Sequence, residues 1–310
     1  MDIIIAHNPL DNPLFWPILR ITGILFLFGF GLVLFFARKD LKAGLKGELG
    51  KRFIGWLILA PIFLIGTFVK GVVAAIILFV FFYLVLAEYI RVVGVQRPYI
   101  IHLYTFVPIT FFTAQYFPEL YSVLPAAAIL TLTLVPIFTH HVEDLYNQLS
   151  FAGRGYLYLV WSVGHVILLQ HLAGTAVIMI TAIGVALSDV MQYTVGKLIG
   201  KHIIAPEVNP RKAWEGLIGD LLGAGMAVYL LRFALPADFS LAHQIMLTFI
   251  IGLGAAWGDL ISSMIKRVAG AKDWGQLIPG HGGLLDRANS MVVVFPLVYY
   301  FSYIVLGYLS

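Results

Sequence analysis

The sequence predicts an all-α polytopic integral membrane protein. Hydrophobic residues make up 60% of its 310 residues and charged residues only 12%, which is not the composition of a soluble domain. Runs of about 17 to 23 mostly apolar residues recur along the whole chain, and a helix needs about that length to cross the hydrocarbon of a bilayer. A membrane barrel would instead show many short alternating segments, whereas stretches such as 71–87 are continuously apolar.

These runs predict about 9–10 transmembrane helices. The amino-terminal segment Met1–Pro13 carries two aspartates and no Lys or Arg, unlike the basic start of a cleaved signal peptide, so the first span is expected to be retained. The second and third spans are separated only by Lys70, and they form either a hairpin or one re-entrant segment. We divide the chain into amino-terminal transmembrane helices, 1–155, and a carboxy-terminal catalytic part, 156–310. The expected spans are 14–36, 53–69, 71–90, 100–117, 120–139, 156–172, 174–195, 217–235, 243–262 and 291–309.

The distribution of Lys and Arg predicts the orientation in the membrane. Threading the ten spans places five loops on one side, and these loops hold all but three of the 20 Lys and Arg residues. By the positive-inside rule this side is cytoplasmic, so both termini lie outside and the active site is expected at the cytosolic face. Because the positive charges follow the membrane topology, they do not indicate a nucleic-acid partner. The five loops are 37–52, 91–99, 140–155, 196–216 and 263–290.

The densest group of reactive residues lies between Asp259 and Asn289. If the ninth span continues as a helix into the cytosol, Asp259, Ser263 and Lys266 lie on one face. Glycines that flank a histidine allow positive φ angles and a close approach of the backbone to a ligand. Carboxylates suit a divalent metal, and Lys and Arg suit phosphate groups. The residues of this segment that fit these needs are Asp259, Ser263, Lys266, Arg267, Lys272, Asp273, His281, Gly282, Gly283, Asp286 and Arg287.

A second polar group follows the seventh span. Asp189 and Lys197 share a helical face near the cytoplasmic end of that span, where an ionisable residue is a functional candidate. Asn209 followed by Pro210 predicts the start of a helix, which would place Lys212 near a positive helix end. An anion could bind there.

Several chemistries are excluded. The chain has no cysteine, so disulfides, thiolate catalysis and cysteine-bound zinc are ruled out. The segment Gly200–His202 is not a phosphate-binding P-loop, because its spacing from Gly196 is one residue short and His202 replaces the required Ser or Thr. Elsewhere, Glu88 and Arg91 are three residues apart and are expected to pair at the membrane interface.

The run from Ser263 to Arg287 closely resembles the signature of the CDP-diacylglycerol synthases, also called phosphatidate cytidylyltransferases. Lys266-Arg267, Lys272-Asp273, Pro279, His281-Gly282-Gly283 and Asp286-Arg287 stand in the family's spacing. The segment from Asp189 to Gly216 is similar to the family's second characteristic stretch, so the likeness covers about the last 120 residues. Two positions depart from the pattern: Asn289 stands where the family usually has another aspartate, and Ala288 stands where it usually has a bulky apolar residue.

The resemblance implies transfer of a cytidylyl group from CTP to phosphatidate or a related phosphorylated lipid, with diphosphate released and Mg²⁺ required. It implies a multi-pass protein of the bacterial inner membrane, and a homodimer is possible. Asp259 and Asp286 would bind the metal. Catalytic roles would fall to Asp259, Asp286, Lys266, Arg287 and His281, and substrate binding to Asp189, Lys197, Lys212, Glu215, Ser263, Arg267, Lys272, Asp273, Gly282 and Gly283.

Three other functions remain open from the sequence. A CTP-dependent lipid kinase would use a similar membrane setting but would move the γ-phosphate and release CDP. A transporter would be expected to carry ionisable residues near the middle of the bilayer, whereas the polar residues here collect at one face. A catalytically weakened relative would only bind lipid.

Overall fold

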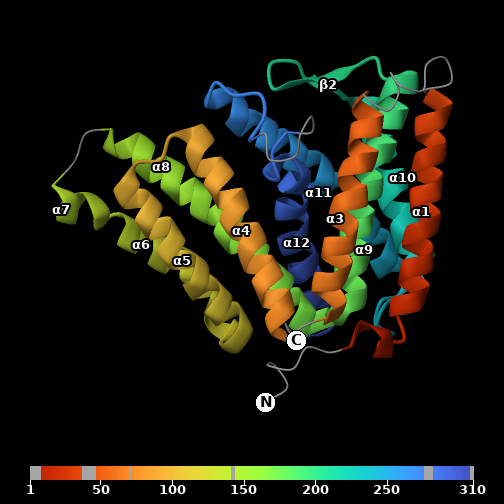
Figure 1. Ribbon diagram of the computed structural model, residues 1–310, viewed down its shortest axis with the longest axis horizontal. Coiled ribbons are helices and arrows are strands. Elements are labelled where there is room, and N and C mark those ends of the chain that lie inside the picture. The colour runs from red at the N-terminus through yellow and green to blue at the C-terminus, as the bar shows by residue number, and fades with distance from the viewer. Residues whose placement is uncertain (1–7, 37–46, 70, 141–143, 276–281, 308–310) are drawn as a thin grey trace.

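The computed structural model describes residues 8–36, 47–69, 71–140, 144–275 and 282–307, and within these ranges the protein is almost wholly helical (Figure 1). Seven stretches of the described residues are long and apolar enough to cross a membrane. The protein is therefore an all-α polytopic membrane protein. Its α-helices are α1 (Phe15–Phe36), α3 (Glu48–Val69), α4 (Gly71–Val93), α5 (Arg97–Tyr116), α6 (Leu124–Leu132), α7 (Val135–Thr139), α8 (Leu145–Gly155), α9 (Ser162–Ile199), α10 (Trp214–Leu231), α11 (Leu241–Val268) and α12 (Leu285–Val305).

Among the described residues, the ten expected spans fall mainly on helical segments. The seven membrane-crossing stretches count 145–199 as one run, and they leave out α5 and the shorter apolar part of α3, Phe53–Val69. The second and third expected spans are two separate helices, α3 and α4, which contact each other. Within the long run, Gly174 has a φ of 75° and separates two helical halves, at the point where the sequence analysis places the boundary between two spans. Glycine adopts this left-handed φ without the steric cost that a Cβ would bring.

Helix α9 is the central element of the fold. It contacts α10, α11, α12, α3 and α5, and most of its side chains are buried. By contrast, α1 exposes Ile24, Leu27 and Phe35 to the surroundings, as expected for side chains that face lipid.

Small residues bring α10 and α9 into close backbone contact. A Cβ added at Gly219 or Gly223 would clash with the backbone of α9 at Met191 or at Leu187 and Ser188. At Gly258 on α11, an added Cβ would likewise clash with the backbone of α12. Such small-residue contacts are typical of helix packing in membranes, where dispersion contacts replace the hydrophobic drive.

A short hairpin, β1 (Ile203–Ala205) and β2 (Asn209–Ala213), joins α9 to α10. The two strands pair in antiparallel fashion, with Ile203 opposite Ala213. The prediction that Asn209 and Pro210 start a helix is therefore wrong, because these residues belong to β2 and α10 begins at Trp214. In Figure 1 the hairpin lies at the upper edge of the molecule, the same edge that the carboxyl end of α11 approaches.

Candidate functional site

Asp259, near the carboxyl end of α11, is the meeting point of three segments. Its Oδ2 accepts hydrogen bonds from Lys212 Nζ at 3.2 Å and Asn209 Nδ2 at 3.3 Å, both from β2. Its Oδ1 accepts one from Asn289 Nδ2 of α12 at 3.2 Å. The ammonium of Lys212 is almost fully buried and also donates to the carbonyl of Ala256 at 3.0 Å, whereas the Asp259 side chain stays 27% exposed. The carboxylate is thus the accessible partner of this ion pair.

Asp286 lies in the first turn of α12 and forms a second ion pair. Its Oδ1 accepts from Lys266 Nζ at 2.7 Å, and the side chains are only 9% and 12% exposed. Its Oδ2 accepts the backbone N–H groups of Trp274 at 2.8 Å and Gly283 at 2.9 Å. A carboxylate at the start of a helix also interacts favourably with the helix dipole. Asp286 therefore ties the backbone at Trp274 and Gly283 to the start of α12.

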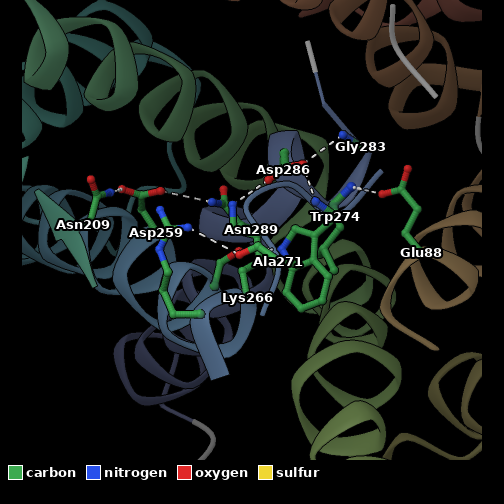
Figure 2. Close-up of polar contacts among 12 residues, drawn as sticks. Glu88, Asn209, Asp259, Lys266, Ala271, Trp274, Gly283, Asp286 and Asn289 are labelled. Atoms are coloured by element: carbon green, nitrogen blue, oxygen red, sulfur yellow. Dashed lines mark hydrogen bonds and ion pairs between the residues drawn. The ribbon is translucent and has the colours of Figure 1, made fainter. Parts of the chain in front are cut away.

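Asn289 binds one ion pair and lies on the same helix as the aspartate of the other. It lies three residues after Asp286 on α12, so both side chains occupy the same face of that helix. Figure 2 shows Asn289 between Asp259 and Asp286, with its amide directed at Asp259. The Asn289 Oδ1 atom accepts the N–H of Ser290 at 2.8 Å, which holds the amide group in this orientation. Asn289 thus contacts Asp259 and shares a helical face with Asp286, and we call these three residues, together with Lys212 and Lys266, the polar cluster.

Helix α11 stays helical to Val268, so Asp259, Ser263 and Lys266 share a face as the sequence predicts. Ser263 is buried on that face. Arg267 is exposed and donates from Nε to the carbonyl of Val208 at 3.4 Å, beside the hairpin. Helix α11 therefore contributes one residue to each ion pair: Asp259 to the first and Lys266 to the second.

A glutamate from the amino-terminal half of the chain holds the same segment from the other side. Glu88 on α4 is buried, and its two carboxylate oxygens accept the backbone N–H groups of Leu284 and Leu285, each at 2.9 Å (Figure 2). These are free donors at the start of α12, so Glu88 satisfies two N–H groups that the helix cannot satisfy itself. Arg91 donates to the carbonyl of Trp274 at 3.4 Å. The expected pairing of Glu88 with Arg91 is replaced by these contacts with the carboxy-terminal segment.

Trp274 is the fully buried anchor of this segment. Its indole N–H donates to Ser262 Oγ at 2.8 Å, and its ring lies against Tyr89, with centroids 5.6 Å apart. Ser262 lies on α11 and Tyr89 lies on α4. These two helices therefore fix the position of Trp274, whose backbone N–H donates to Asp286. Ser262, rather than its neighbour Ser263, provides the hydroxyl for this contact.

The structure explains why glycine is needed at two of the predicted positions. Gly282 has a φ of 84°, the positive value that the sequence analysis expects. Gly283 approaches Glu88 so closely that an added Cβ would clash with its carboxylate. The close approach at Gly283 is therefore to a protein side chain.

The remaining predicted residues occupy other positions. Glu215 lies in the first turn of α10, where it bonds His202 Nδ1 at 2.6 Å and accepts the N–H groups of Lys201 and His202, so it fixes the base of the hairpin. The Lys197 ammonium lies 5.7 Å from the Tyr193 ring centre. Asp189 and Arg287 are partly buried, Lys272 and Asp273 are exposed, and His281 lies outside the described residues.

The donor set can be tested against a magnesium ion. Among the described residues, no three Asp, Glu or His side chains gather into a cage. Magnesium, however, is commonly held by one or two carboxylates together with substrate phosphates. Asp259, with its partly exposed carboxylate, and Asp286, on the same polar cluster, fit this second arrangement.

The sequence analysis gave Glu88 the wrong partner, Arg91, and missed Trp274 and Ser262. Glu88 accepts hydrogen bonds from backbone groups nearly 200 residues away in the sequence. Because every residue except proline carries a backbone N–H, the sequence does not indicate which residues are its partners. Two signals were present. The first was Glu88 itself, because an acidic residue within an apolar span is a functional candidate by default. A lone tryptophan in a polar, glycine-rich segment was the other.

Comparison with known proteins identifies the family. The sequence model of the cytidylyltransferase family matches residues 50–305. The chain is 29% identical over 227 residues to an uncharacterised Escherichia coli protein, YnbB, covering 71% of this chain and 75% of that protein. It is 31% identical to the phosphatidate cytidylyltransferase of Staphylococcus saprophyticus, covering 49% and 55% of the two chains. It is 40% identical to that of Haemophilus influenzae, covering 38% and 43%.

The matches to the named enzymes thus span about half of their length or less, while the family match spans most of this chain and includes every described residue of the two ion pairs. This chain belongs to the cytidylyltransferase family.

Proposed function

We propose that the protein transfers a cytidylyl group from CTP to phosphatidate, forming CDP-diacylglycerol and diphosphate in phospholipid biosynthesis. The observation that carries this proposal is the polar cluster, in which Asn289 binds Asp259 of one lysine–aspartate pair and lies one helical turn after Asp286 of the other. Curated relatives from Staphylococcus saprophyticus and Haemophilus influenzae carry the name phosphatidate cytidylyltransferase, and their similarity supports this choice of reaction.

The reaction is a direct phosphoryl substitution. An oxygen of the lipid phosphate attacks the α-phosphorus of CTP and forms a new P–O bond, while the bond from that phosphorus to the bridging oxygen of the β-phosphate breaks. The leaving electron pair goes to diphosphate, so no covalent enzyme intermediate and no other reactant is needed.

The two reactants are both polyanions, and the protein must offset their repulsion. Lys212 and Lys266 are held in place by Asp259 and Asp286, and Arg287 adds a third cation next to Asp286. Magnesium would be held by Asp259 and Asp286, and it would supply charge neutralisation at the phosphates. Asp259 is the more open carboxylate, so we assign it the larger share of this role.

The arrangement in the membrane follows from the same site. The lipid's acyl chains stay in the bilayer, and CTP reaches the cluster from the basic face, which we place in the cytosol of a bacterial cell at the inner membrane. The homodimer stays a prediction, which light scattering of the purified protein would check.

Position-specific labelling tests the reaction. Purified protein in nanodiscs receives magnesium, phosphatidate and CTP labelled at either the α- or the γ-phosphate. Cytidylyl transfer puts the α-label into lipid and the γ-label into diphosphate. A lipid kinase would put the γ-label into lipid, and a transporter or binding protein would put neither there, so either result contradicts the proposal.

A further inference from the structure

Two apolar cavities lie between the helices of this protein, and they differ in one respect. The first lies among α1, α3 and α9, and its lining, from Thr22 to Val190, contains no charged residue. The second lies among α3, α4, α12 and the start of α9, and its lining contains one charged residue, Arg287. Arg287 directly follows Asp286, so the second cavity begins at the polar cluster.

The second cavity extends from that cluster into the membrane-spanning part of the fold. Along α12 its lining runs from Arg287 through Met291 to Phe295. Eight residues of helix rise by about 12 Å, which is comparable to a large part of one leaflet's hydrocarbon. Leu78 of α4 and Val166 of α9 line the opposite walls. The cavity is therefore long and almost wholly apolar, and Arg287 lines the end that lies beside Asp286 mainly through its nonpolar atoms.

The cavity also reaches the lipid-facing surface. Ile62 of α3 is one of its lining residues, and 47% of that residue is exposed. A hydrocarbon chain could therefore enter from the side without passing through water. The apolar walls offer a hydrocarbon chain dispersion contacts, and the arginine at the end beside Asp286 carries a guanidinium, a group that binds phosphate oxygens in pairs.

We propose that this cavity, and not the uncharged one, binds an acyl chain of the lipid acceptor, with the lipid's phosphate held by Arg287 beside Asp286. This inference rests on the proposed function and names the acceptor's binding site within it. Recognition requires both parts of the ligand: the terminal phosphate for Arg287 and the hydrocarbon for the α3, α4 and α12 walls. Diacylglycerol lacks the first part, and glycerol 3-phosphate lacks the second.

Photolabelling tests the site without requiring turnover. Wild-type protein in phosphatidylcholine nanodiscs is irradiated with a phosphatidate that carries a diazirine in one acyl chain, and labelled peptides are identified by mass spectrometry. We expect labels on the parts of α3, α4 and α12 around Ile62, Leu78 and Met291. An excess of unlabelled phosphatidate should compete, whereas diacylglycerol and glycerol 3-phosphate should compete at least about tenfold less well. Labels confined to α1 and the second half of α9, or equal competition by diacylglycerol, would overturn the proposal.

A matched pair of substitutions gives a second measurement. Leu78→Trp fills the proposed cavity, and Leu25→Trp makes the same change in the uncharged cavity. We expect Leu78→Trp to raise the KM for phosphatidate about tenfold and to change the KM for CTP less than about twofold. Leu25→Trp should change both less than about twofold.

An equal or larger effect of Leu25→Trp on the phosphatidate KM would contradict the assignment. If Leu78→Trp does not fold, the wild-type photolabelling still decides. The failure of the proposed function is distinguishable, because wild-type protein would then form no CDP-lipid at all, whereas failure of this inference leaves an active enzyme labelled elsewhere.

Discussion

The two lysine–aspartate pairs of this protein use the same residue types in different surroundings. In the Lys212–Asp259 pair the lysine is buried and the carboxylate is 27% exposed, and amide side chains supply the other contacts. In the Lys266–Asp286 pair both side chains are nearly buried, and Asp286 also accepts two backbone N–H groups. The difference leaves Asp259 the more accessible carboxylate, whereas Asp286 also holds the backbone at Trp274 and Gly283 against the start of α12.

The largest effect is expected for Asp259→Asn. The amide oxygen can still accept from Lys212, but the negative charge that would hold magnesium is lost, so turnover should fall by about a thousandfold. The amide cannot also accept from Asn289, and it leaves the buried Lys212 ammonium without its counter-charge, so the apparent melting temperature should fall as well. Labelled-CTP assays and thermal unfolding in nanodiscs measure the two quantities. Near-normal turnover would remove Asp259 from the reaction.

Asp286→Asn should lower turnover by about a hundredfold and should also destabilise the fold. An amide has only one acceptor oxygen, so it cannot serve Lys266 on one side and the N–H groups of Trp274 and Gly283 on the other. The donors left without an acceptor should lower the free energy of unfolding by about 1–3 kcal/mol. Thermal unfolding beside Asp259→Asn gives the comparison, and equal melting temperatures for the two variants would mean that the pairs have the same structural role.

Glu88→Gln tests whether the second pair depends on α4. The amide group places a donor against the N–H of either Leu284 or Leu285, which loosens the start of α12 where Asp286 lies. We expect turnover to fall by about tenfold with the KM for CTP changed less than about twofold. Glu119→Gln, an exposed glutamate in the turn before α6, is the matched control and should behave as wild type. A wild-type turnover for Glu88→Gln would limit Glu88 to packing.

Asn289→Asp should have the smallest effect, about threefold in turnover. The change replaces a donor to Asp259 with a second carboxylate, and the repulsion between them is relieved when a divalent cation is present. The magnesium concentration needed for half-maximal activity should therefore change more than the maximal rate. A magnesium titration of both proteins checks this, and identical titration curves would separate Asn289 from the metal site.

The sequence predicted the spans well because a membrane helix leaves a strong record of length and apolar composition. It also placed Asp259 and Lys266 on one helical face, since the period of a helix is independent of tertiary contacts. It failed at Asn209, where strand pairing with β1 outweighed a local helix-start pattern. It missed the partners of Glu88 because those partners are backbone amides, which every residue carries.

The glycines that join α10 to α9 have a consequence for how lipid could enter. Where two backbones touch, neither helix can tilt or slide without a steric clash, so this side of the bundle should behave as a fixed wall. Lipid would then enter elsewhere, where the cavity lined by α3, α4 and α12 reaches the lipid-facing surface. Because the hairpin that carries Lys212 joins α9 to α10, the close contact of these two helices would keep Lys212 and its partner Asp259 in place while lipid enters.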